Sequence, residues 1–269
     1  MVLSKQFKNN FEKRPQTKTL YRNKTPYHDL YVQESGNIRG LISGSGMASE
    51  QSSVDILDLH KHVYDYSLLA MYSLCFVPNP SAVLVVGLGG GVIPRELNHY
   101  FPNLKIDILE IDPEIITVAK QFFFFEESEG VKVHIGDAFA TIKNMTQKYD
   151  IVVLDAFLSE YTPFHLMTKE FLSSLKSVCT SDAVVVVNAS NIYVSFGSQI
   201  LTLVEILGNN PHILHGPTNN LVDVFYFPLS ECSLNSLQLP SIYYPDLLPL
   251  KFHLTEEIKK AKIFRLENV

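Results

Sequence analysis

A run of five apolar residues, Ala82–Val86, leads directly into a glycine-rich turn. The turn contains Gly87, Gly89 and Gly91, and an amphipathic stretch, Val92–Tyr100, follows it. A continuous β-branched run is typical of a strand buried on both faces. Glycine allows a sharp turn and a close approach by a ligand, and the next helix offers free N–H groups. We therefore predict a strand, a ligand-binding turn and a helix, although a tight turn without a ligand has the same pattern.

Units of apolar strand and helix repeat as far as residue 227. Such alternation indicates an α/β fold with a parallel sheet covered by helices on both faces. The further expected strands are Lys105–Glu110, Val131–Ile135, Asp150–Leu154, Ala183–Val187 and Asn220–Phe227. The expected helices between them are Glu114–Phe124, Ala138–Met145, Thr168–Val178 and Val194–Leu207.

The chain before this region has a different pattern. His28–Glu34 and Asn37–Ser43 alternate apolar and polar residues around the turn Ser35-Gly36, which predicts a β-hairpin. Apolar residues then recur at helical spacing over Ile56–Phe76. Pro78-Asn79-Pro80 interrupts that helix and marks a linker.

These patterns divide the chain into four predicted segments. Residues 1–25 form a polar, flexible arm, and residues 26–77 form the hairpin and helix region. Residues 78–229 form a Rossmann-like nucleoside-binding domain. Residues 230–269 form a C-terminal extension with a short basic helix, Glu256–Lys262.

Charge and cysteine content exclude several classes of protein. The net charge of −6 disfavours a nucleic-acid binder. Three scattered cysteines without a C-x-x-C pair indicate neither a zinc site nor a disulfide framework. The longest apolar runs are too short to span a bilayer, and the basic N-terminus has no signal-peptide core. We expect a cytoplasmic protein without membrane or nucleic-acid partners.

Carboxylates end three of the predicted strands, where ligands bind in such sheets. Glu110 lies about 20 residues beyond the glycine turn, the place of an acid that binds ribose hydroxyls. Asp137 is suited to bind an adenine amino group or to cap the next helix. Because NAD sites do not need this acid, it favours a nucleoside such as S-adenosylmethionine. Asp155 ends the fourth strand and faces the ligand crevice, or else forms an Asx turn in its own loop.

Together these motifs resemble the spermidine synthase family, the polyamine aminopropyltransferases. The resemblance covers residues 27–190 and rests on motif order and spacing. The motifs are Tyr27-His-Asp-Leu-Tyr-Val, Gln51, Pro78-Asn-Pro80, Val-Leu-Val-Val-Gly-Leu-Gly-Gly-Gly, Leu-Glu-Ile-Asp-Pro-Glu, Gly-Asp-Ala and Leu-Asp155-Ala-Phe. The resemblance implies a class I methyltransferase-like fold with a small N-terminal β-domain.

The resemblance also implies roles for individual residues. Gly87, Glu110 and Asp137 would hold the nucleoside of decarboxylated S-adenosylmethionine, and Asp155 would hold the reacting amine. Gln51, Tyr64 and Tyr66 would contact a diamine such as putrescine.

Three positions depart from the family pattern. Gly90 stands where the family's glycine loop has an aspartate that helps to hold the donor's aminopropyl amine. The family's Asp-Ser-Ser-Asp-Pro reads Asp155-Ala-Phe-Leu-Ser159, which lacks the second acid. The family's Tyr-His-Glu reads Tyr64-Asp-Tyr66. This variant resembles a divergent, spermidine synthase-like branch.

The first hypothesis is therefore aminopropyl transfer to a diamine, with Asp155 as general base and no metal. A methyltransferase that uses S-adenosylmethionine is the alternative that Gly90 favours, since an acid there would repel the donor carboxylate. A non-catalytic nucleoside-binding homologue is the third. The edges of a small β-domain invite pairing, so we also expect a homodimer through the N-terminal region.

Overall fold

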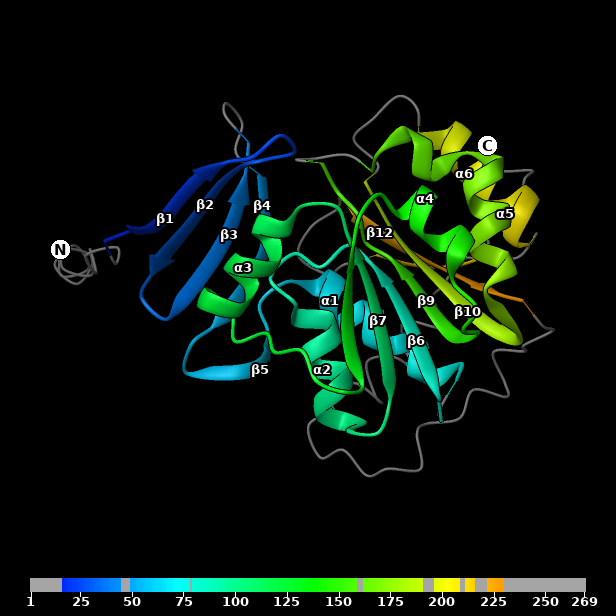
Figure 1. Ribbon diagram of the computed structural model, residues 1–269, viewed down its shortest axis with the longest axis horizontal. Coiled ribbons are helices and arrows are strands. Elements are labelled where there is room, and N and C mark those ends of the chain that lie inside the picture. Colours follow the sequence, from blue (N-terminus) through cyan, green and yellow to red (C-terminus); the bar gives the residue numbers. More distant parts are fainter. Residues whose placement is uncertain are drawn as a thin grey trace, which may run out of the picture.

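The computed structural model describes residues 16–44, 49–77, 79–158, 162–190, 196–208, 211–215 and 222–229. These residues form a small antiparallel sheet and a larger sheet flanked by helices (Figure 1). The first fifteen residues of the expected arm, Pro78 of the expected linker and the whole expected C-terminal extension lie outside the described residues. The division into four segments stays a prediction.

The N-terminal sheet has five strands in the order β1-β2-β3-β4-β5, and all neighbours are antiparallel. The strands are β1 (Lys18–Lys24), β2 (Asp29–Ser35), β3 (Ile38–Ser43), β4 (Ser49–Asp55) and β5 (Asp58–His62). The predicted hairpin is β2–β3, and Gly36 takes a left-handed conformation in its turn. Leu30, Val32 and Leu41 form the fully buried centre of this sheet.

Two expectations for this region were wrong. Residues 18–24 of the expected arm form β1, because Leu20 and Tyr21 pack against the hydrophobic core. Residues 58–62 are strand β5, and the helix α1 begins only at Asp65. The spacing of apolar residues predicted a helix from Ile56, but the chain turns there instead. The Asp55 carboxylate accepts a hydrogen bond from the Leu57 N–H in this turn, and β5 then pairs with β4. Helix α1 (Asp65–Met71) continues into the 3-10 turn η1 (Tyr72–Cys75).

The larger sheet has seven strands in the order β11-β12-β10-β9-β6-β7-β8. Its strands are β6 (Ala82–Val86), β7 (Lys105–Glu110), β8 (Val131–Ile135), β9 (Tyr149–Leu154), β10 (Cys179–Ser190), β11 (His212–His215) and β12 (Val222–Pro228). Strands β6 to β10 are parallel, as predicted. The expectation of a fully parallel sheet was wrong, because β12 pairs antiparallel with β10 and with the unexpected strand β11.

Helices cover both faces of this sheet, as the apolar strands predict. Val83 and Val85 of β6 belong to one hydrophobic cluster, while Leu84 and Val86 belong to a second on the opposite face. In Figure 1, α1, α2 and α3 lie toward the N-terminal sheet, and α4, α5 and α6 lie on the far side. The helices are α2 (Val92–Tyr100), α3 (Pro113–Phe122), α4 (Ala138–Thr141), α5 (Lys169–Ser177) and α6 (Phe196–Leu207), with 3-10 turns η2 (Ile142–Asn144) and η3 (Phe164–Met167).

Polar contacts attach the N-terminal sheet to α2 and α3. The Tyr21 hydroxyl donates to the Glu114 carboxylate at the start of α3. Arg39 donates to the Phe122 carbonyl at the end of α3 (2.9 Å). From the other side, Arg95 of α2 donates to the Leu59 carbonyl (2.6 Å). The small sheet is thereby held against the glycine-turn side of the larger one.

In the described ranges, no helix is long and apolar enough to cross a membrane.

Candidate active site

The carboxyl ends of four neighbouring strands, β8, β7, β6 and β9, open onto one cavity. The cavity has a volume of about 100 Å³ and is open to solvent. Gly87, Glu110, Asp137 and Asp155 all line it. These four residues come from separate strand–helix units, so the fold brings together what the sequence spreads over 69 positions.

The glycine turn forms one wall of the cavity. Gly87 and Gly89 line it, and their φ angles are +100° and +54°, where residues with a side chain are strained. A Cβ atom on Gly87 would also lie 2.4 Å from the Asp155 carbonyl oxygen. Gly91 instead packs against Phe125 and precedes α2 in a left-handed conformation. Glycine at 87 and 89 therefore both permits the turn and leaves backbone exposed to a ligand.

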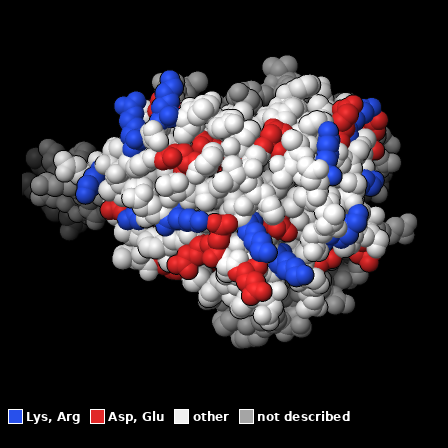
Figure 2. Space-filling view, in the orientation of Figure 1, with Lys and Arg blue, Asp and Glu red and all other residues white. Residues whose placement is uncertain are grey.

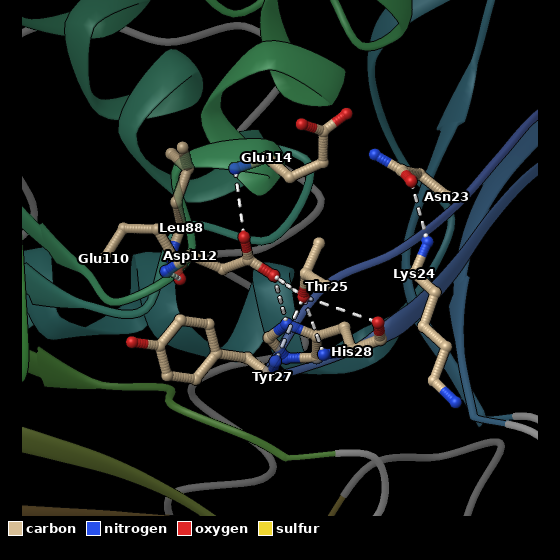
Figure 3. Close-up of polar contacts among 9 residues, drawn as sticks. All are labelled: Asn23, Lys24, Thr25, Tyr27, His28, Leu88, Glu110, Asp112 and Glu114. Atoms are coloured by element: carbon tan, nitrogen blue, oxygen red, sulfur yellow. Dashed lines mark hydrogen bonds and ion pairs between the residues drawn. The ribbon is translucent and has the colours of Figure 1, made fainter.

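Glu110 connects this turn to the start of α3. One carboxylate oxygen accepts from the Leu88 N–H and the other from the Asp112 N–H, both at 2.9 Å. The residue is 6% exposed, and this burial raises the pKa of its carboxyl while the two backbone hydrogen bonds oppose the shift. Its position between the two loops is visible in Figure 3. Glu110 thus sets the shape of the cavity wall.

The loop between β1 and β2 reaches the same wall. The His28 Nδ1 atom lies 2.8 Å from Asp112 Oδ2, and the Thr25 hydroxyl donates to that oxygen at 2.6 Å (Figure 3). Asp112 also caps α3 by accepting from the Glu114 N–H (3.0 Å). His28 lines the cavity. Sequence reasoning did not single out His28, and its only signal was its place in the Tyr27-His-Asp motif.

Asp137 follows strand β8 and lines the same cavity. Its Oδ1 accepts from the Ala140 N–H (3.1 Å) as the cap of α4, and its Oδ2 lies 2.8 Å from His165 Nε2. Asp137 and His165 both line the cavity. Asp137 therefore caps α4, and its binding of an adenine amino group stays a prediction. His165 was not anticipated from sequence.

Asp155 follows β9 and lines the cavity as a half-buried residue. Burial raises the pKa of this carboxyl to about 7, although a hydrogen bond from Asn188 Nδ2 to Oδ1 (2.7 Å) favours the charged form. A carboxyl with such a pKa exchanges protons readily near neutral pH, which suits a general base.

Two of the three residues expected to contact the amine share the cavity with Asp155. Gln51 and Tyr66 line it, and the Tyr66 hydroxyl donates to the Gln51 carbonyl at 3.2 Å. Burial, with the nearby Asp155 charge, raises the pKa of Tyr66. Tyr64 lies outside the set of lining residues, and its ring stacks on Tyr66 with centroids 6.3 Å apart. Burial and a hydrogen bond to Glu50 raise the pKa of Tyr64.

Gly90 is enclosed by its neighbours. A Cβ atom there would lie 2.8 Å from the Ser52 hydroxyl oxygen and 3.0 Å from a ring carbon of Phe123. Ser52 is 1% exposed, and its hydroxyl lies 3.3 Å from that of Tyr66. An aspartate at this position would therefore require Ser52 and Phe123 to move.

Comparison with known proteins agrees with this architecture. The model of the spermine/spermidine synthase domain matches residues 62–204, more than half of the chain. The chain belongs to the spermine/spermidine synthase family. The polyamine aminopropyltransferase of Vibrio vulnificus (strain CMCP6) is 34% identical over 198 residues, which cover 72% of this chain and 66% of that protein. The match thus spans slightly less than two thirds of the relative's length.

A solved structure shares the fold, and part of the chain is similar in sequence to a methyltransferase. The crystal structure of spermidine synthase from Thermotoga maritima superposes with a TM-score of 0.65 at 14% identity, covering 90% of this chain and 88% of that one. The human eEF1A lysine and N-terminal methyltransferase is 36% identical over 121 residues, which cover 40% of this chain and 17% of that protein. The class I methyltransferase-like fold with a separate N-terminal β-sheet is confirmed.

Proposed function

We propose that the protein transfers an aminopropyl group from decarboxylated S-adenosylmethionine to a diamine such as putrescine. The observation that carries this proposal is Asp155, a half-buried residue on the wall of the cavity whose carboxyl has a pKa raised to about 7 by desolvation. The spermine/spermidine synthase domain and the Vibrio polyamine aminopropyltransferase support the reaction class.

In this reaction the diamine is the nucleophile. Its nitrogen lone pair attacks the aminopropyl carbon next to the sulfonium, the carbon–sulfur bond breaks, and sulfur keeps the electron pair. The amine must first be deprotonated, because alkylamines have a pKa of about 10, close to that of lysine. Asp155 is the residue to which we assign this proton. Methylthioadenosine leaves as a neutral thioether, so its departure needs no acid.

The donor would occupy the rest of the cavity. Gly87, Gly89 and Glu110 line the cavity and would contact the ribose, and Asp137, which also lines it, would bind the base. Gly91 would support the loop through its packing on Phe125. Gln51 and Tyr66 would orient the amine beside Asp155, and Tyr64 would fix Tyr66 through ring stacking. Holding both reactants in line contributes much of the rate in such a transfer.

Methyl transfer from S-adenosylmethionine is the second candidate, and the surroundings of Gly90 favour it. The family's aspartate helps to hold the aminopropyl amine of the decarboxylated donor. At Gly90 an aspartate would fit only if Ser52 and Phe123 moved. The similarity of part of the chain to the human methyltransferase also supports methyl transfer. A neutral glycine loop would tolerate the donor's carboxylate, which an acid would repel.

Ligand binding and turnover separate the two candidates. We expect decarboxylated S-adenosylmethionine and methylthioadenosine to raise the melting temperature by about 5 °C or more at 100 times Kd, because a ligand that binds only the folded state stabilises it. With putrescine and the decarboxylated donor, methylthioadenosine should be released. Methyl transfer from S-adenosylmethionine, with no release from the decarboxylated donor, would establish the second candidate instead.

We also propose a homodimer that forms through the N-terminal sheet. Strand β1 is the edge of this sheet, and an unpaired edge is a template for pairing. Light scattering at working concentration should give about twice the 30.4 kDa chain mass. A monomeric mass under these conditions would reject the dimer.

The remaining expectations about partners concern the surface. Acidic and basic side chains are interspersed over the face shown in Figure 2. A cytoplasmic location, and the absence of membrane, nucleic-acid and metal partners, stay predictions from composition.

A further inference from the structure

His62 connects strand β5 to helix α1, the helix whose Tyr66 lines the cavity. It is the last residue of β5, and its Nδ1 atom lies 2.9 Å from the Ser67 hydroxyl oxygen. Ser67 is 2% exposed, and its hydroxyl donates to the Tyr64 carbonyl at 2.9 Å. Two consecutive hydrogen bonds therefore tie the start of α1 to the end of β5, and Tyr66 lies within this tied turn.

These contacts determine which ring nitrogen of His62 carries a hydrogen. A serine hydroxyl has one hydrogen, and that of Ser67 points to the Tyr64 carbonyl. The Ser67 oxygen therefore accepts from His62, so the Nδ1 atom carries the hydrogen. In the neutral ring the lone pair is then on Nε2, which is the atom that takes up a proton.

The bond to His62 takes the place of a helix cap. Tyr64 occupies the N-cap position of α1, and its side chain makes no capping hydrogen bond. The helix has only seven residues, a length at which a helix depends on contacts outside itself. The Tyr66 hydroxyl is anchored on the Gln51 carbonyl (3.2 Å), and the backbone turn that carries Tyr66 is anchored on His62 through Ser67.

The charged groups around His62 disfavour an additional positive charge. Helix α2 presents Arg95 and Glu96 to it, and β5 presents His60. The Glu96 carboxylate is 1% exposed and already lies 3.3 Å from Arg95 Nε and 3.1 Å from His60 Nδ1. The His60 ring in turn stacks on His99 of α2, with centroids 3.8 Å apart. One buried carboxylate thus already serves a guanidinium and a pair of stacked imidazoles.

Strand β4 and helix α1 add no free carboxylate to these surroundings among the side chains that the structure describes. Strand β4 pairs its Val54 with His62, and its Asp55 accepts from Lys61 Nζ at 3.1 Å. Helix α1 presents the Ser67 hydroxyl, and burial raises the pKa of the neighbouring Tyr64 phenol, which therefore stays neutral.

The folded arrangement consequently suits a neutral His62. Burial lowers the pKa of the ring, the Glu96 charge opposes this shift, and the charges of Arg95 and His60 add to it. When the β5–α1 junction opens, the ring returns to water, where the pKa of histidine is about 6.5. The closed junction therefore has its full stability above about pH 6.5 and loses stability as the pH falls below that value.

We propose that His62 is a positioning residue for Tyr66: the neutral ring holds the first turn of α1 through Ser67, and uptake of a proton by the ring releases this turn and withdraws Tyr66 from the cavity. Acid thereby weakens the contact that we assign between Tyr66 and the reacting amine, independently of the protonation of Asp155. The effect on turnover rests on the proposed function, whereas the effect on α1 does not.

Two substitutions separate the hydrogen bond of His62 from its charge. His62→Asn places an amide N–H near the position of the Nδ1–H group, so it can keep the bond to Ser67, and it does not titrate. His62→Leu removes both the donor and the charge. His134→Asn is the matched control, because His134 is also partly buried and makes one hydrogen bond, to Asp107 at 2.6 Å, in the larger sheet.

Amide hydrogen exchange of the full chain tests the effect on α1 without any reaction. In the wild type, protection of α1, corrected for the intrinsic exchange rate at each pH, should be constant from about pH 8 to about pH 6.5 and should fall about fivefold or more by about pH 5. His62→Asn should keep most of its protection over the whole range. His62→Leu should lower the protection about fivefold even at about pH 8, because one hydrogen bond is lost. Helix α5 is the internal reference and should exchange equally in all variants.

Two results would overturn the proposal. The first is a pH dependence of α1 protection in His62→Asn that equals that of the wild type and of His134→Asn. The second is wild-type protection of α1 in His62→Leu at about pH 8. If His62→Leu does not fold, the comparison of His62→Asn with His134→Asn decides.

The second measurement uses turnover with putrescine and decarboxylated S-adenosylmethionine. The putrescine KM of the wild type should equal that of His62→Asn at about pH 8 and should exceed it about threefold or more at about pH 5.5. Both proteins contain Asp155, so its titration cancels in this ratio, and their affinities for methylthioadenosine should be equal in calorimetry. A ratio that does not change with pH would contradict the link from His62 to Tyr66. Absence of turnover in the wild type would contradict the proposed function alone, and hydrogen exchange would then decide on His62.

Discussion

Replacing Asp155 with asparagine is expected to lower methylthioadenosine release by about 10²–10⁴-fold, the usual contribution of a general base. Asparagine keeps the size of the side chain and one acceptor oxygen, so the hydrogen bond from Asn188 Nδ2 can persist. It cannot accept the proton of the amine. Donor binding should therefore be retained, because we assign the nucleoside contacts to Glu110 and Asp137.

The measurement is release of methylthioadenosine with putrescine present, alongside calorimetric titration of the donor into both proteins. Asp150→Asn is a control for the same change on the same strand, because Asp150 accepts from the Ser81 and Ala82 backbone at the far end of β9. It should alter stability and leave the chemical step in place. Release at the wild-type rate by Asp155→Asn would remove Asp155 from the role of base.

The pH profile gives a related expectation for the wild type. The base form of Asp155 is the deprotonated one, and burial places its pKa at about 7. Activity should therefore fall as the pH decreases below about 7 and should reach a plateau above it. An acid limb centred near the ordinary aspartate value, about 3.9, would show that another group controls the reaction.

Strand positions could be predicted from sequence because each buried strand is a short apolar run. Strands β6 and β7 begin and end where the sequence predicts, and α2 does so as well. The pattern failed at β5 and β11, which are strands of five and four residues that pair only with their neighbours along the chain, β4 and β12. Leu59 shows the reason: one apolar residue in a polar segment fits a helix spacing and a strand equally well.

The site was predictable to the extent that its residues end strands of the parallel sheet. Glu110, Asp137 and Asp155 could be anticipated from that rule and do line one cavity. The same rule applies to Asn188 after the valine run of β10, but its uncharged amide drew no attention. His28 and His165 could not be found this way, because they come from loops whose position is set by packing. The crowding of Gly90 by Ser52 likewise depends on contacts between two separate sheets.

The role of Glu110 gives the second large expected effect. Glu110→Ala should weaken binding of an S-adenosyl ligand by about tenfold or more, because hydrogen bonds to a charged group are worth about 1.5–3 kcal/mol. The loss has two sources. A ribose would lose its acceptor, and the Leu88 and Asp112 N–H groups would lose theirs, which releases the glycine turn from the start of α3.

Calorimetry with methylthioadenosine and with S-adenosylmethionine measures the first source, and the melting temperature measures the second. Titrations should be made well below the variant's melting temperature, since each buried N–H left unpaired costs about 1–3 kcal/mol of stability. Glu126→Ala is the matched control, because Glu126 is an exposed glutamate beyond α3. Glu110→Gln refines the result: its amide keeps one acceptor for the turn but places an N–H₂ group against a second backbone donor, so affinity should still fall. If Glu110→Ala binds as tightly as Glu126→Ala, the nucleoside binds elsewhere, and the cavity at the strand ends serves another ligand.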